Sequence, residues 1–181
     1  MQLVILDRDG VINEDSDDYI KSPEEWRPIP GSLEAIARLR RAGWHVVVAT
    51  NQSGVARGAF DLDTLMRIHE KMHRAVREAG GLIDAVFFCP HGPDDNCACR
   101  KPKPGLFYDI AQRLHIELKG VPAIGDSLRD LQAARAAGAR PLLVRTGKGS
   151  QTLAHPVIDA DVPVFNDLAR AVDALLTPDA S

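Results

Sequence analysis

Two carboxylates, Asp7 and Asp9, stand two positions apart directly after a short apolar run near the start of the chain. In an extended segment, residues two apart point to the same side, so both acids can face one ligand. Gly10 follows them and allows the backbone to turn sharply away. Such a pair can hold a cation or move protons, whereas a solvated turn is the alternative if the motif is taken alone.

Three more segments carry side chains suited to binding a phosphate or a metal ion. Thr50–Gly54 offers four hydrogen-bonding side chains before a glycine, and Arg100–Gly105 carries three cations on a backbone stiffened by two prolines. Asp126 and Asp130 are one helical turn apart, so both lie on one face of a helix start. Taken singly, these segments also fit a polar loop, a solvated basic turn and an N-cap cluster.

Apolar, β-branched runs alternate with helical patterns along the chain, which is typical of a parallel sheet covered by helices on both faces. The predicted strands are Leu3–Leu6, Trp44–Ala49, Ile83–Phe88, Val121–Ile124, Pro141–Val144 and Asp161–Phe165. The predicted helices run from Ser32 to Gly43, around Leu65–Val76, and over Leu106–His115, Asp130–Ala137 and Asp167–Leu176, with Ser32, Ser127 and Asn166 as N-caps. We therefore expect an α/β fold with three layers, Rossmann-like, and mostly parallel strands.

Each of the four motifs comes at the end of a predicted strand. Ligands bind beyond the carboxyl ends of the strands in open parallel sheets, so the motifs are expected to meet at one edge. Three acids gathered there would repel one another unless a cation joined them, and hard carboxylate oxygens favour Mg²⁺. Acids, a metal ion and nearby cations together indicate phosphoryl transfer.

The three cysteines are an odd number and all fall within eleven residues. With one histidine they form two close pairs: Cys89, His91, Cys97 and Cys99. This is the donor set of a structural Zn²⁺ site and needs no disulfide partner, whereas free thiols in a surface loop are the alternative. Because Arg100 and Lys101 follow directly, a zinc ion would fix where both cations point.

Length and charge narrow the function further. The 181 residues suit one domain, and the net charge of −3 gives no basic excess for holding nucleic acid or an anionic membrane. No apolar run reaches the ~20 residues that span a bilayer, and the N-terminus lacks the pattern of a secretory signal. We expect a cytoplasmic protein without nucleic-acid or membrane partners.

The chain resembles the haloacid-dehalogenase-like (HAD) superfamily of phosphatases, whose signature motifs occur here in order at Asp7 and Asp9, Thr50, Lys101, and Asp126 with Asp130. The resemblance implies that Asp7 attacks phosphorus to form an aspartyl phosphate, while Asp9 acts as general acid and then general base. Thr50 and Lys101 would bind the transferring phosphoryl group, with Lys103 as the rival lysine. The implied Mg²⁺ ligands are Asp7, the backbone carbonyl of Asp9, and Asp126, with Asp130 outside them.

Many members carry a cap domain that closes over the substrate, but the spacing of the motifs here leaves no room for one. We expect a single domain over residues 1–176, with a zinc-binding insert at residues 89–104 and a flexible tail at residues 177–181. Specificity would then depend on three loops: Asn13–Trp26, Asn51–Arg57 and Cys89–Lys101. The open surface and modest size suit a monomer.

Among capless members with a zinc loop, the chain resembles the branch that removes the C7 phosphate of D-glycero-D-manno-heptose 1,7-bisphosphate, a step toward the ADP-heptose of lipopolysaccharide. The resemblance rests on Leu6–Asn13, Thr50–Gly58, Cys89–His91, Cys97–Pro102 and Val144–Gly149. It implies a small phosphorylated sugar as substrate, with Arg100 holding the remaining phosphate or sugar hydroxyls. The implied substrate contacts are Asp15, Asp18, Tyr19, Thr50, Asn51, Gln52, Ser53, Arg57, Arg100 and Lys101.

The chain departs from this branch at Ser127, where a lysine is frequent, so Arg129 or Arg145 would have to supply the missing charge. The segment between His91 and Cys97 is also shorter than in many relatives. Both departures bear on the choice of substrate more than on the chemistry.

Other functions fit parts of the pattern. A histidinol-phosphate phosphatase would share the acids and the zinc loop, but a bisphosphate substrate better explains the extra cations Arg57, Arg100 and Arg145. A non-catalytic zinc-bearing binding module would need neither Asp7 nor Asp9. A transferase or phosphomutase is disfavoured because a mutase needs an enclosed site that protects the phosphoenzyme from water.

Overall fold

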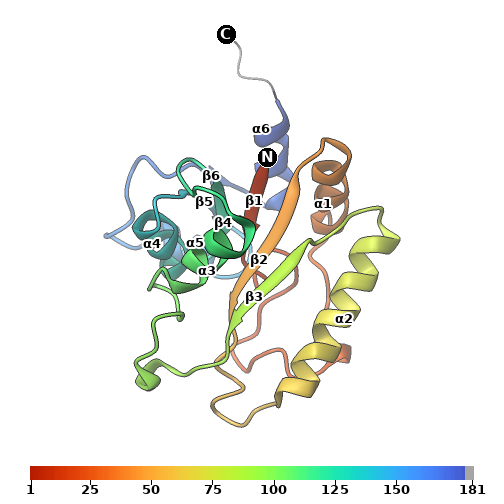
Figure 1. The fold of residues 1–181 in the computed structure, drawn as a ribbon, viewed down its shortest axis with the longest axis vertical. Helices are drawn as coiled ribbons and strands as arrows, with labels where there is room; N and C mark the ends of the chain where they lie inside the picture. Colours follow the sequence, from red (N-terminus) through yellow and green to blue (C-terminus); the bar gives the residue numbers. More distant parts are fainter. Residues whose placement is uncertain (178–181) are drawn as a thin grey trace.

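Six parallel strands form one sheet in the order β3-β2-β1-β4-β5-β6 (Figure 1). The strands are β1 Leu3–Leu6, β2 His45–Asn51, β3 Ala85–Cys89, β4 Pro122–Gly125, β5 Arg140–Val144 and β6 Val164–Phe165. The computed structural model describes residues 1–177, so the tail expected at residues 177–181 lies outside the described residues except for Thr177. The predicted parallel sheet is confirmed.

Helices cover both faces of this sheet, as Figure 1 shows. They are α1 Ser32–Arg41, α2 Leu62–Glu78, α3 Gly105–Leu114, α4 Leu128–Ala136, α5 Gly149–Leu153 and α6 Leu168–Leu176, with 3₁₀ turns η1 Pro23–Glu25 and η2 Pro93–Asp95. α1, α2 and α6 share one apolar core that includes Ile36 and Met72, while α3 and α4 share another that includes Phe107 and Ile110. The three-layer α/β fold expected from the sequence is therefore observed.

Two of the predicted helix caps are wrong. Ser32 is the first residue inside α1, and its hydroxyl donates to the carbonyl oxygen of Val11 (2.8 Å), so Gly31 at φ 88° precedes the helix instead. α6 is capped by Asp167 rather than by Asn166. In contrast, Ser127 caps α4 as predicted: its hydroxyl accepts from the N–H of Asp130, and the carboxylate of Asp130 accepts from the N–H of Ser127.

The C-terminal part of the chain also differs from the prediction in its elements. Helix α5 was not predicted, and the strand expected over Asp161–Phe165 is reduced to its last two residues. The N–H of Val162 closes a turn onto the carbonyl of Asp159 (3.1 Å), and Pro163 has no N–H to donate to a neighbouring strand. The carbonyl of Pro163 still accepts from the N–H of Leu143 (3.0 Å), and the register with β5 begins at Val164.

The topology places a crevice beside β1. From β1 the chain first builds β2 and β3 on one side and then returns to build β4 on the other. Connections therefore diverge at the carboxyl ends of β1 and β4, and this divergence is where open parallel sheets bind ligands. The N–H of Asp7, at the end of β1, donates to the carbonyl of Ile124 in β4 (2.9 Å), which ties these two strand ends together.

Within residues 1–177, no helix is long and apolar enough to span a membrane.

Candidate active site and metal centre

A polar cleft of about 310 Å³ lies at the carboxyl ends of the strands. The residues expected at the site that line it are Asp7, Asp9, Asp15, Tyr19, Thr50, Asn51, Gln52, Ser53, Arg57, Arg100, Lys101 and Asp126. Residues that follow β1, β2 and β4 and residues of the loop that carries Arg100 and Lys101 therefore meet in one cleft, as their positions at strand ends predict.

Lys101 lines this cleft but is almost fully buried, with 3% of its side chain exposed. Its Nζ lies 3.1 Å from Asp7 Oδ1 and 2.6 Å from Asp130 Oδ1, and it donates to the carbonyl of Ala49 (2.7 Å). Burial opposes the charge on Lys101, but the two carboxylates outweigh it and raise its pKa. The lysine is therefore a fixed cation beside Asp7.

The rival lysine points elsewhere. Lys103 Nζ donates to Asn96 Oδ1 (3.2 Å) and to the carbonyl of Cys97 (3.0 Å) on the cysteine loop. Lys103 does not line the cleft. Its contacts are those of a residue that holds the loop, and Lys101 is the one that faces Asp7.

Three acids crowd together where β1 and β4 end. One oxygen from each of Asp7, Asp126 and Asp130 lies within 4.8 Å of the others. Burial and then the charge of Asp130 raise the pKa of Asp7 to about 7 and that of Asp126 to about 9. Acids that repel each other this strongly fit a cation, and hard oxygen ligands fit Mg²⁺.

Asp130 differs from the other two because both of its oxygens are already engaged. Oδ1 pairs with Lys101, and Oδ2 accepts hydrogen bonds from the hydroxyl (2.8 Å) and the N–H (3.0 Å) of Ser127. Although burial opposes its charge, Lys101 and Ser127 lower the pKa of Asp130. Asp7 and Asp126 thus fit a metal ion directly, and Asp130 fits the role of holding Lys101.

Two glycines leave the space in which Asp126 sits. A Cβ on Gly10 would lie 2.1 Å from Asp126 Oδ2, and a Cβ on Gly147 would lie 2.2 Å from the same atom. Both glycines also have a positive φ angle, which residues other than glycine rarely adopt. The N–H of Lys148 then donates to Asp126 Oδ2 (2.8 Å) and fixes its direction.

Asp9 is surrounded by donors. Its Oδ1 accepts from Arg8 Nε (3.0 Å) and Asn13 Nδ2 (2.9 Å), and its Oδ2 accepts from Gln52 Nε2 (3.1 Å). Burial disfavours the ionised carboxylate, but Arg8 and these hydrogen bonds outweigh burial and lower its pKa. Asp9 is therefore a negatively charged proton acceptor in the free protein.

Two of the expected substrate contacts hold other residues of the site. Asn51 Nδ2 donates to the carbonyl of Lys101 (3.0 Å), and Asn51 Oδ1 accepts from the N–H of Lys101 (3.0 Å). Gln52 Nε2 donates to Thr50 Oγ1 (2.9 Å) as well as to Asp9. These amides organise the residues around them.

Several cations also line the cleft. Arg57, Arg100, Arg129 and Lys148 all line it, whereas Arg145 does not. Burial and then the positive charge of Arg129 lower the pKa of Arg100, with a smaller contribution from Arg57. A cluster of like charges of this kind is suited to an anion.

One expected contact lies outside the cleft, and several residues inside it were missed. Asp18 pairs with Lys21 (3.0 Å) on the exposed side of its loop. The cleft is also lined by Ser127, Arg129 and Asp130, which the sequence indicates for other roles, and by residues that the sequence does not indicate: Ser16, Asp17, Ile20, Pro93 and Lys148. Lys148 follows the fifth strand, so the strand-end rule applied to Val144–Gly149 could have found it.

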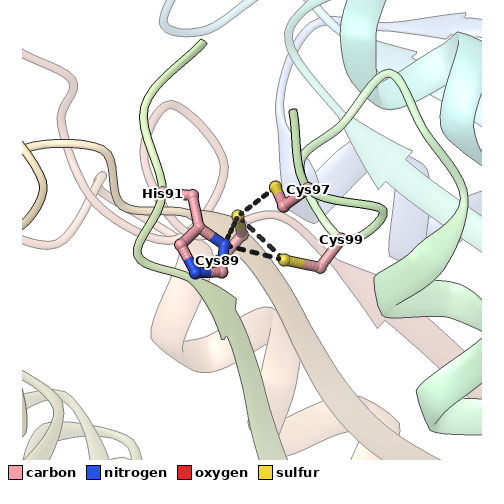
Figure 2. Close-up of side chains that lie close together, drawn as sticks. All are labelled: Cys89, His91, Cys97 and Cys99. Carbon is pink, nitrogen blue, oxygen red and sulfur yellow. Dashed lines mark hydrogen bonds between the residues drawn. The ribbon is translucent and has the colours of Figure 1, made fainter. Parts of the chain in front are cut away.

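The Cys/His cluster lies at the end of β3 and on the loop that follows it (Figure 2). Pro93 and Arg100 on this loop line the cleft. Cys89 Sγ is 3.6 Å from His91 Nδ1, 3.6 Å from Cys97 Sγ and 3.1 Å from Cys99 Sγ, and His91 Nδ1 is 3.3 Å from Cys99 Sγ. Ligand atoms around a tetrahedral Zn²⁺ lie about 3.5–3.8 Å apart. The cysteines are not in disulfides, and the four donors fit a closed zinc site.

Comparisons with known proteins agree with this geometry. The family model of HAD-hydrolase-like proteins matches residues 98–171, and that of polynucleotide kinase 3 phosphatase matches residues 2–127. The chain is 61% identical to a D-glycero-β-D-manno-heptose-1,7-bisphosphate 7-phosphatase of Bordetella bronchiseptica, over 97% of this chain and 98% of the relative. It is 55% identical to the enzyme of the same name from Pseudomonas aeruginosa, over 96% of this chain and 97% of the relative.

Solved structures give the same result. A crystal structure of D,D-heptose 1,7-bisphosphate phosphatase from B. bronchiseptica with magnesium and phosphate matches with a TM-score of 0.95 and 61% identity, covering 97% of this chain and 98% of that one. The corresponding phosphatase from Burkholderia thailandensis matches with a TM-score of 0.79 and 49% identity, covering 98% and 100%. The chain therefore belongs to the HAD-like hydrolases, in the family of the D-glycero-β-D-manno-heptose-1,7-bisphosphate 7-phosphatases.

Proposed function

We propose that this protein is a Mg²⁺-dependent phosphatase that removes the C7 phosphate of D-glycero-β-D-manno-heptose 1,7-bisphosphate and releases heptose 1-phosphate for ADP-heptose and lipopolysaccharide core biosynthesis. The observation that carries the proposal is a single cleft that brings Asp7, Lys101 and Asp126 together with the cations Arg57, Arg100 and Arg129. The acids and the buried lysine suit the phosphate that is transferred, and the arginines suit a phosphate that is kept. Relatives with this name cover almost the whole chain.

We assign the phosphoryl transfer to Asp7. Its carboxylate attacks phosphorus, the bond to the sugar oxygen breaks, and an aspartyl phosphate forms. Lys101, fixed 3.1 Å from Asp7 Oδ1, offsets the negative charge that the phosphate brings. Thr50, whose hydroxyl oxygen accepts from Gln52, lines the cleft as a further group beside the phosphate.

Asp9 moves the protons of both steps. The negative charge of a bound phosphate favours protonation of the nearby Asp9 carboxylate, and that proton passes to the departing sugar oxygen. The ionised Asp9 then takes a proton from water as the water attacks the aspartyl phosphate and frees inorganic phosphate. Mg²⁺, held by Asp7, Asp126 and the backbone carbonyl of Asp9, supplies charge neutralisation at the phosphoryl oxygens when bound.

The substrate assignment is tested by comparing kcat/KM for the heptose 1,7-bisphosphate with that for histidinol phosphate. The proposal expects a preference for the bisphosphate, because a monophosphate leaves the arginine cluster unpaired. A higher kcat/KM for histidinol phosphate would overturn the substrate and leave the phosphatase chemistry in place.

We further propose that Arg129 supplies the charge missing at Ser127. Arg129→Ala should lower kcat/KM for the bisphosphate by roughly 10- to 100-fold, mainly through KM, because a charge-assisted hydrogen bond to phosphate is lost. For heptose 7-phosphate, which has no second phosphate, kcat/KM should change by no more than about twofold. Steady-state kinetics on both substrates measures this difference.

Arg145→Ala is the matched control, because Arg145 is exposed and does not line the cleft. It should leave both substrates unaffected. Equal losses in the Arg129 and Arg145 variants, or an equal loss of Arg129→Ala on both substrates, would contradict the assignment.

Removal of zinc should weaken catalysis through the loop that carries Arg100 and Lys101. A chelator that removes the zinc ion from Cys89, His91, Cys97 and Cys99 should lower kcat/KM by about tenfold or more, because misplaced charged groups stabilise the transition state less well. Loop order is followed independently by NMR line widths of residues 90–100, and the metal content by elemental analysis.

Re-addition of Zn²⁺ with excess Mg²⁺ is the control and should restore both the spectrum and the activity. If a protein shown to be free of zinc kept its loop order and its activity, the structural role of the cluster would fail.

The remaining expectations complete the proposal. Residues 1–176 act as one catalytic domain with the zinc insert at residues 89–104, and α2 and this insert occupy the chain between β2 and α3 where a cap would otherwise fit. The protein acts as a cytoplasmic monomer on a small diffusible sugar phosphate rather than on nucleic acid or membranes. The net charge of −3 leaves no basic excess for nucleic acid or an anionic membrane.

A further inference from the structure

Arg8 lies between the two acids of the first motif, yet its side chain points away from the cleft. The side chain is fully buried, at 0% exposure, and Arg8 does not line the cleft. Its Nε donates to Asp9 Oδ1 (3.0 Å), and its Nη2 lies 2.9 Å from the same oxygen. Nη2 makes no hydrogen bond of its own within the described residues, so the pairing of Nε and Nη1 has to hold this buried guanidinium in place.

The partner of Nη1 is His69, which helix α2 places behind the motif. Arg8 Nη1 and His69 Nε2 are 3.0 Å apart. His69 is 5% exposed, and its ring meets Phe88 of β3 edge-on at 6.1 Å. An arginine can only donate, so Nε2 must be the acceptor and the ring proton must lie on Nδ1.

The charge state of His69 agrees with this arrangement. Burial, followed by the positive charge of Arg8, lowers the pKa of His69 to about 3, with Asp9 opposing the shift and His73 adding to it. The ring is therefore neutral near pH 7 and keeps its acceptor available for Arg8.

We propose that His69 is a positioning residue for Asp9: it holds the guanidinium of Arg8 against Asp9 Oδ1 and so keeps Asp9 Oδ2 directed into the cleft. Oδ1 receives its donors from Arg8 and Asn13, which do not line the cleft, and Oδ2 receives its one donor from Gln52, which does. Without an acceptor at position 69, both terminal nitrogens of this buried guanidinium lack a hydrogen-bond partner, and that cost favours turning the group away from Asp9 Oδ1. The inference rests on the proposed phosphatase function.

The test uses two substrates that differ in their need for a proton. The heptose bisphosphate loses a sugar alkoxide that must be protonated, whereas p-nitrophenyl phosphate loses a phenolate that need not be. For both, kcat/KM reports the steps up to loss of the leaving group. His69→Leu should lower kcat/KM about tenfold on the sugar phosphate and no more than about twofold on p-nitrophenyl phosphate.

Two further variants separate positioning from folding. His69→Gln can place an amide oxygen where Nε2 was, and it should restore kcat/KM on the sugar phosphate to within about threefold of the wild-type protein. His73→Leu makes the same change one turn along α2 at a half-buried site without a contact to Arg8, and it should leave both substrates unaffected.

An equal loss of His69→Leu on both substrates, or equal activities of the Leu and Gln variants, would overturn the inference in favour of a merely structural role. If His69→Leu does not fold, His69→Asn replaces it, because its shorter amide cannot reach Arg8 and should differ from His69→Gln in the same way. If the wild-type protein does not hydrolyse the heptose bisphosphate, the proposed function fails by itself, and the comparison is made on any alkyl phosphate that it does hydrolyse.

Discussion

An Asp7→Asn variant should fold normally and lose at least about 10⁴-fold of its phosphatase activity, because an amide cannot attack phosphorus and no aspartyl phosphate can form. The substitution keeps the shape of the side chain, and Lys101 keeps two other partners, the carboxylate of Asp130 and the carbonyl of Ala49. The loss is therefore assigned to chemistry rather than to a collapsed site. Phosphate release under saturating Mg²⁺ measures it, with acid quenching to trap any acyl phosphate.

Asp109→Asn provides the control, because Asp109 is exposed on α3 and does not line the cleft. It should keep wild-type activity. If Asp7→Asn retained activity within about tenfold of that control, Asp7 would not be the nucleophile.

The stability of the metal-free Asp7→Asn variant should equal or exceed that of the wild-type protein. Burial and the charge of Asp130 raise the pKa of Asp7 from 3.8 to about 7, so at pH 8 its ionised form is disfavoured in the folded state relative to the unfolded chain. An amide removes that penalty. Thermal melts of both proteins at pH 8 with a Mg²⁺ chelator test this.

The framework of the site could be predicted from sequence because its position depends on local patterns. β1 and β4 are short apolar runs, and the residues that follow such runs in a parallel sheet must meet at one edge. Asp7 and Asp126 needed no more than this rule. The Cys/His cluster was equally accessible, since its donors lie within eleven residues.

Contacts between distant parts of the chain could not be predicted in this way. Asn51 has the composition of a substrate contact, yet it binds the backbone of Lys101, 50 positions away. His69 belongs to a helix whose apolar stripe was predicted, but nothing in that stripe indicates that Arg8, 61 positions earlier, is its partner. Such pairs depend on how α2 packs against the sheet and on where the chain that follows β3 returns to β2.

Backbone conformation decides the remaining differences. Asp18 and Tyr19 are neighbours on one loop, and Tyr19 adopts a positive φ of 60°. Tyr19 lines the cleft, while the carboxylate of Asp18 pairs with Lys21 outside it. A left-handed residue that is not glycine has no clear sequence signal, so the two side chains could not be told apart beforehand.

Replacing Asp9 by Asn should lower kcat/KM on the heptose bisphosphate by roughly 10²- to 10⁴-fold, because the departing sugar oxygen loses its proton donor. On p-nitrophenyl phosphate, kcat/KM should fall far less, since that leaving group needs no proton. Equal losses on the two substrates would contradict the acid role of Asp9, and Asp109→Asn again serves as the control.

Stability should respond to Asp9→Asn in the direction opposite to Asp7→Asn. Although burial opposes its charge, Arg8 and the hydrogen bonds from Asn13 and Gln52 lower the pKa of Asp9. Its ionised form therefore stabilises the fold above the unfolded pKa of 3.8. That stability is lost as the pH falls through the folded pKa. At pH 8 the amide removes this contribution and leaves the buried guanidinium of Arg8 without its counter-ion. In the absence of metal, Asp9→Asn should therefore lower the melting temperature, whereas Asp7→Asn should leave it unchanged or raise it. Equal shifts in the two variants would contradict the opposite charge environments that the structure gives these two acids.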